Sequence, residues 1–85
     1  EEQSDGCFNL FPNPVVRDEF TLTNCNSSQN IKLMIYDVTG VLVKMEIVKQ
    51  NVQSISVCDL EDGCYTVVVI MNKAVISRKL IIQRM

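Results

Sequence analysis

Histidine and tryptophan are both absent from the 85-residue chain, and glycine occurs only three times. Without histidine, the common arrangements for acyl transfer lose their usual general base. The glycines lie far apart, so they cannot form a glycine-rich phosphate loop. No pattern singles out a nucleophile among Ser54, Ser56 and Ser77, which we expect to be outward-facing strand residues. We therefore predict that the chain is not an enzyme.

Long apolar runs and basic blocks are missing as well. The longest wholly apolar run covers residues 67–71, far short of the roughly 20 residues that span a bilayer. The net charge is −2 and no basic block exceeds the Arg78-Lys79 pair, so nucleic acid and anionic membranes are poor partners. No signal peptide is recognisable. The polar opening EEQSDG suggests a linker remnant, from a longer chain or a mature form.

The four cysteines, by contrast, are a high count for a chain of this size: Cys7, Cys25, Cys58 and Cys64. None forms a CxxC pair, and their spacings do not suit a four-thiolate zinc site. They allow three disulfide connectivities, between which the sequence does not decide, and free thiols stay open as well. The acidic run at residues 59–63 does not continue with the ligands of a calcium loop. We expect no metal and no cofactor.

The apolar residues alternate with a period of two, which is typical of half-buried β-strands. In the first run, for example, Phe20 and Leu22 share one face and Thr21 and Thr23 the other. No helical stripe or internal repeat is present. Six or seven short antiparallel strands must close as a sandwich or a barrel. The expected strands cover residues 19–23, 31–36, 41–48, 54–58, 64–71 and 75–82.

Polar segments separate these strands. Asp37-Val38-Thr39-Gly40 predicts a tight turn between antiparallel strands, with Gly40 at positive φ. Asn72-Lys73 predicts a two-residue hairpin turn. Residues 24–30 and 50–53 are expected to be a polar loop and a short break.

One motif favours the sandwich over the barrel. In LEDGCYTVVV, Leu60 lies five residues before Tyr65, Gly63 lies at the bend, and Val67 and Val69 follow on one face. This spacing is similar to the tyrosine corner of immunoglobulin-like domains, where the hydroxyl bonds to backbone just upstream and fixes a crossover between sheets. The alternative is a simple hairpin with an inward tyrosine.

The segment Pro12-Asn13-Pro14 breaks the alternating pattern near the start. Proline lacks a backbone donor and has a fixed φ, so neither proline can lie in a central strand. We expect a stiff entry that leads from a linker (residues 1–9) into a folded domain (residues 10–85). Leu10 or Phe11 is expected to anchor it at the edge of the core.

Taken in order, FPNPVVRDEFTL, IYDVTGVLV, SISVCDLEDGCYTVVV and RKLIIQ resemble one known family. This is the type IX secretion system C-terminal sorting domain of Bacteroidetes, also called the Por secretion tail (type A). The resemblance covers residues 10–83. It implies an all-β fold, an immunoglobulin-like antiparallel β-sandwich of about seven short strands.

The resemblance also implies a function. Such a domain is a non-catalytic signal that directs a larger cargo protein through the periplasm and across the outer membrane by the type IX translocon. A sortase-like surface peptidase then removes it, so that the cargo stays at the cell surface or outside the cell. Cleavage would fall within or before residues 1–9.

The family motif can be placed on this sequence residue by residue. The entry, the turn, the corner and the terminal strand correspond to Pro12, Asn13, Pro14, Asp37, Gly40, Gly63, Tyr65, Lys79, Leu80, Ile81 and Ile82. Two features depart from the family pattern. The family has few cysteines, whereas here Cys58 and Cys64 flank the corner and could form a disulfide. A basic residue is also common at the tail, where this chain has Arg84 before Met85.

The competing hypothesis is an accessory immunoglobulin-like module, or a small secreted β-sandwich, with a spacer, adhesive or glycan-binding role. Glycan binding has little support, because the chain has only five aromatic residues with which to form a platform. Fold alone does not separate these functions. Export of a fused reporter would favour the sorting function, and selective binding on a glycan array would favour the glycan-binding role.

Overall fold

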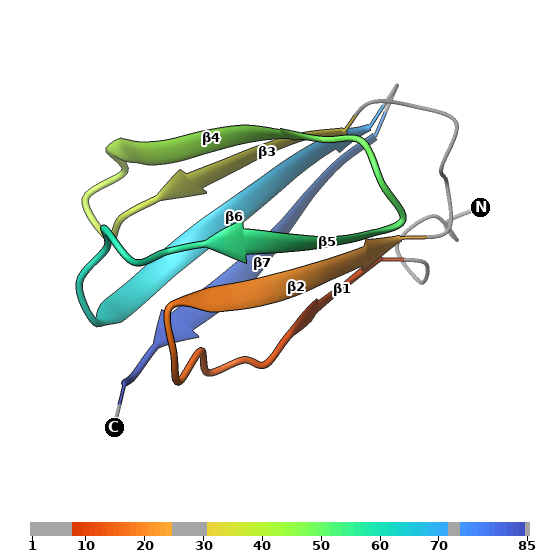
Figure 1. Ribbon diagram of the computed structural model, residues 1–85. Helices are drawn as coiled ribbons and strands as arrows, with labels where there is room; N and C mark the ends of the chain where they lie inside the picture. Colours follow the sequence, from red (N-terminus) through yellow and green to blue (C-terminus); the bar gives the residue numbers. More distant parts are fainter. Residues whose placement is uncertain (1–7, 25–30, 72–73, 85) are drawn as a thin grey trace.

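The computed structural model describes residues 8–24, 31–71 and 74–84. These residues form seven β-strands in two antiparallel sheets that pack face to face (Figure 1). One sheet has the order β1-β2-β5 and the other the order β4-β3-β6-β7. The predicted β-sandwich is confirmed. The strands are β1 Phe8–Phe11, β2 Glu19–Asn24, β3 Ile31–Tyr36, β4 Leu42–Val48, β5 Val52–Ser56, β6 Gly63–Met71 and β7 Ala74–Ile82.

Alternation decides which side chains fill the space between the sheets. Phe20 and Leu22 of β2 are buried, as predicted, while Thr21 and Thr23, which alternate with them, are not. Each buried aliphatic or Phe side chain contributes about 1.5–3 kcal/mol of transfer free energy. The other buried strand residues follow the same two-residue period, and Val15 of the entry segment and Val57 just after β5 join them. The core consists of Val15, Phe20, Leu22, Ile31, Leu33, Ile35, Val48, Ile55, Val57, Val67, Val69, Leu80 and Ile82.

Strand β1 is the main element that the periodicity did not predict. It pairs antiparallel with β2, from Phe8 opposite Asn24 to Phe11 opposite Thr21. The Pro-Asn-Pro segment therefore connects two strands instead of leading into the first one. Leu10 is the anchor that packs against the core, whereas Phe11 remains 49% exposed.

The remaining differences are small shifts of strand ends. Strand β5 begins at Val52, within the expected polar break, because Val52 and Gln53 pair with Thr23 and Leu22 of β2. The expected Asn72-Lys73 turn lies outside the described residues, as does the expected loop after Asn24. The backbone on either side of residues 72–73 pairs antiparallel, as a hairpin requires. Within the described ranges there is no helix that could cross a membrane.

Candidate functional site

The Pro-Asn-Pro segment lies along the outer edge of β7, in the half of that strand nearest the chain end. The two prolines have no backbone N–H, and the side-chain amide of Asn13 makes the hydrogen bonds to β7 instead. Its Nδ2 donates to the carbonyl of Lys79 at 2.8 Å, and its Oδ1 accepts from the backbone N–H of Ile81 at 3.1 Å. The amide therefore pairs with β7 much as a strand residue would.

Val15 continues the same pairing with its backbone. Its N–H donates to the carbonyl of Ile81 at 2.7 Å, and its carbonyl accepts from the N–H of Gln83 at 2.8 Å. Val15 forms a parallel bridge with Ile82, and its side chain is fully buried in the core. The edge of β7 is thus covered from residue 79 to residue 83. This satisfies backbone groups that an open edge strand would expose.

The tyrosine corner forms where the chain crosses from one sheet to the other, between β5 and β6. The Tyr65 hydroxyl donates to the backbone carbonyl of Glu61 at 2.6 Å, and Leu60 packs against the core. The predicted corner is confirmed, and the simple hairpin is excluded because β5 and β6 belong to different sheets. Burial, followed by the charge of Glu61, raises the pKa of Tyr65. Gly63 has a φ of 157°, which L-residues rarely adopt.

The corner adjoins the terminal strand. In the ladder between β6 and β7, Gly63 lies opposite Ile82, and Tyr65 lies opposite Leu80. Leu80 and Ile82 are buried in the core, whereas Lys79 is exposed and Ile81 partly so. The entry, corner and terminal strand of the predicted motif therefore meet at one end of the sandwich.

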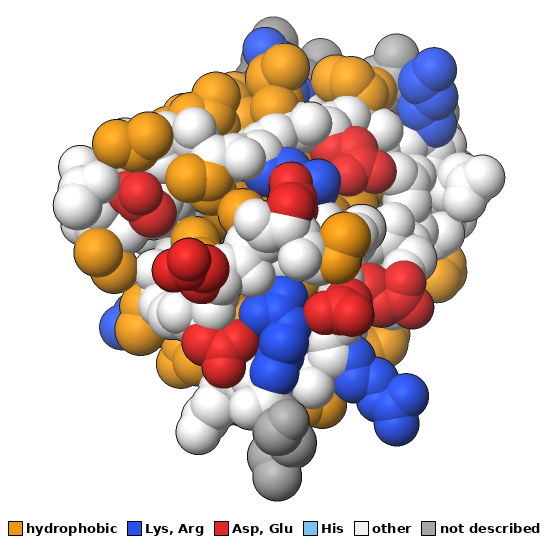
Figure 2. All heavy atoms as spheres, turned by 60° about the vertical axis from the view of Figure 1, so that its left-hand side comes forward, with side chains coloured by type: hydrophobic (Ala, Val, Ile, Leu, Met, Phe, Trp, Pro, Cys, Tyr) orange, Lys and Arg blue, Asp and Glu red, His pale blue; other side chains and the backbone are white. Residues whose placement is uncertain are grey.

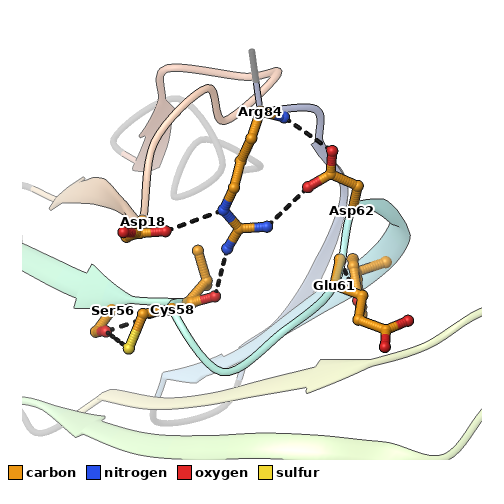
Figure 3. Close-up of polar contacts among 8 residues, drawn as sticks. Asp18, Ser56, Cys58, Glu61, Asp62 and Arg84 are labelled. Carbon is orange, nitrogen blue, oxygen red and sulfur yellow. Dashed lines mark hydrogen bonds and ion pairs between the residues drawn. The ribbon is translucent and has the colours of Figure 1, made fainter.

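Arg84 joins three segments at this end (Figure 3). Its Nε donates to Asp18 at 3.0 Å, its Nη1 to Asp62 at 2.8 Å, and its Nη2 to the carbonyl of Val57 at 2.8 Å. Its own backbone N–H also donates to Asp62 at 3.0 Å. The side chain is only 24% exposed, and hydrogen bonds to Asp62 and then Asp18 raise the pKa of Arg84. The sequence suggested Arg84 as a tail residue, but nothing in it pointed to Asp18 and Asp62.

The turn at Asp37-Gly40 lies at the same end of the sandwich (Figure 1). Gly40 has a φ of 86°, as predicted, and donates to the carbonyl of Asp37 at 3.0 Å. The Asp37 carboxylate accepts from Thr39 Oγ1 at 2.6 Å, from the Thr39 N–H at 2.9 Å and from the Val41 N–H at 3.1 Å. These bonds, the Thr39 hydroxyl first, lower the pKa of Asp37. The bonds of the Asp37 carboxylate stay within the turn and do not connect the turn to the entry segment, the corner or β7.

Cys58 and Cys64 are both exposed free thiols, so the suggested disulfide between them is not formed. Cys58 follows a strand of the three-stranded sheet, and its sulfur accepts a bond from the Ser56 hydroxyl at 3.4 Å. Cys64 is the second residue of β6 in the other sheet. Cys7 and Cys25 lie outside the described residues. In the described ranges, no three His, Cys, Asp or Glu side chains gather as a metal site would require.

The three candidate serines, Ser54, Ser56 and Ser77, are exposed strand residues, as expected. Two acidic side chains of the crossover form ion pairs: Asp62 with Arg84, and Asp59 with Lys44 at 3.9 Å. Figure 2 turns this end of the molecule forward and shows acidic side chains beside Lys and Arg. The arrangement holds the chain end in place and offers a mixed-charge surface.

A model of one protein family, the secretion system C-terminal sorting domain (Por_Secre_tail), matches residues 9–83. The chain belongs to this family. The match covers nearly the whole chain, including the entry segment, the turn, the corner and β7. No curated protein matches the chain.

Proposed function

We propose that this sorting domain directs a larger cargo protein across the outer membrane by type IX secretion. The observation that carries the proposal is the family match, which extends over residues 9–83. In this proposal the cargo precedes the domain in the chain and passes through the periplasm before export. It is then retained at the cell surface or released.

The role of the domain in export is to be recognised, without catalysing a reaction. Its partners are the type IX translocon and a sortase-like surface peptidase, which cuts before the folded unit. We assign recognition to the residues of the family motif, of which Asn13, Lys79 and Ile81 are in direct contact. The division into a linker of residues 1–9 and a domain of residues 10–85 stays a prediction, with paired backbone reaching back to Phe8.

Export of a fusion protein tests the proposal. Residues 1–85 are joined to the carboxyl end of a periplasm-directed fluorescent protein, in a cell with a working type IX system. The matched control is the same fusion in a strain without the translocon. We expect reporter at the surface or in the medium only in the first strain. Retention in the periplasm of both strains would contradict the proposal and favour an accessory module.

A further inference from the structure

The last described residues do not form a free tail. Arg84 is bonded to the connection after β1 through Asp18, and to the crossover between sheets through Val57 and Asp62 (Figure 3). The connection and the crossover also contact each other, since the N–H of Val57 donates to the carbonyl of Asp18 at 2.7 Å. Two stretches of chain, distant from Arg84 in sequence, therefore hold the last described residues in one position.

The backbone near the end is engaged as well. The Ile81 N–H donates to Asn13, the Gln83 N–H to the carbonyl of Val15, and the Arg84 N–H to Asp62. A receptor that bound these residues as an extended peptide would add them as a strand, and that mode needs free edge groups. Such a receptor would first have to break the bonds to Asn13, Val15 and Asp62.

We infer that the export machinery recognises the carboxyl end of this domain in its folded position, as a surface composed of the chain end, Asp18 and the 57–62 crossover. The inference rests on the proposed function. Arg84 is then a positioning residue, which acts by fixing the end of β7 against the other two segments. A signal of this kind depends on residues far from the carboxyl end, whereas an extended-peptide signal does not.

The reporter fusion described above, carrying single substitutions, distinguishes the two modes. Arg84→Ala removes the joining side chain, while Asp18→Ala and Asp62→Ala remove its partners and leave the terminal sequence intact. Glu19→Ala is the matched control for Asp18, because Glu19 is its neighbour and is exposed, and its side chain makes no hydrogen bond or ion pair among the described residues. Ile55→Val, in the middle of the core, controls for a general loss of stability.

Two quantities are measured for each fusion: the secreted fraction of reporter, and the melting temperature of the purified domain. We expect Arg84→Ala, Asp18→Ala and Asp62→Ala each to lose most of the secreted reporter while still folded at the growth temperature. Glu19→Ala and Ile55→Val should be secreted like the wild type. Because both substitutions remove the bond between Arg84 Nη1 and Asp62, the double variant Asp62→Ala with Arg84→Ala should lose less secretion than the sum of the two single losses.

Other results would overturn the inference. If the wild-type fusion is exported and only Arg84→Ala fails, the machinery recognises the terminal sequence itself. If export falls in proportion to melting temperature for all variants, Ile55→Val included, only global stability matters. In both cases the sorting function would stand and the folded-surface signal would not. A wild-type fusion that stays in the periplasm would reject the sorting function, and this inference with it.

Discussion

The side-chain amide of Asn13 donates a 2.8 Å hydrogen bond to the carbonyl of Lys79, across 66 residues of chain. The same side chain accepts from the N–H of Ile81, so one residue bonds to two successive edge positions of β7. The prolines on either side limit the backbone but supply no donor. An asparagine between two prolines therefore lets a non-pairing segment close the edge of a strand.

Replacing Asn13 with alanine should destabilise the domain by about 1–2 kcal/mol, since two hydrogen bonds are lost at a largely exposed site. Urea denaturation measures the loss, and hydrogen exchange should quicken at the Ile81 amide. Asn9→Ala is the control, because Asn9 is exposed on β1 and its side chain has no hydrogen bond within the described part. Unchanged exchange at Ile81 would show that Val15 alone holds this edge.

Tyr65→Phe keeps the packing of the ring and removes the hydroxyl that donates to the Glu61 carbonyl at 2.6 Å. We expect a loss of about 1 kcal/mol, or a fall of about 4–8 °C in melting temperature for a domain of this size. Tyr36→Phe is the comparison, because the Tyr36 hydroxyl donates only to the sulfur of Met34, at 3.5 Å. Equal losses in the two variants would mean that the corner bond adds nothing beyond an ordinary tyrosine.

Local patterns predicted what local physics determines. The alternation of Phe20 and Leu22 set their burial, and Asp37 with Gly40 set the turn, because each depends on neighbours in the chain. Strand β1 escaped prediction because four residues, FNLF, are too few for a period to show. It is stabilised by pairing with β2, which is a tertiary effect.

The long-range contacts of the site could not be predicted from the sequence. Asp18, Asp62 and Arg84 are ordinary surface residues in composition, and only the fold places both carboxylates within 3.0 Å of the Arg84 guanidinium. For the same reason the sequence showed Asn13 as part of an entry segment and gave no sign of its bonds to β7. The tyrosine corner could be predicted from the sequence because the hydrogen-bond partner of Tyr65, Glu61, is only four residues away.

Asp37 predicts a stability change at low pH. Its carboxylate accepts three hydrogen bonds within the turn, which lower its pKa from the ordinary 3.8. A depressed folded pKa gives stability that is complete above 3.8 and is lost as the pH falls through the folded value. The free energy of unfolding of the wild type should therefore exceed that of Asp37→Asn by a constant amount above a pH of about 5. This difference should shrink below a pH of about 4. Urea denaturation of both proteins across this range measures it, and a margin unchanged at the acid end would exclude the effect.

Peptide mapping can show which cysteines are free thiols. Cys58 and Cys64 are free and exposed, so iodoacetamide should modify both in the native protein. Trypsin separates the sites, because cleavage after arginine and lysine gives peptides 1–17, 18–32 and 50–73, and the last contains both free thiols. We therefore expect peptide 50–73 to carry two carbamidomethyl groups after native labelling. An unmodified peptide 50–73 with an internal bridge would contradict the assignment.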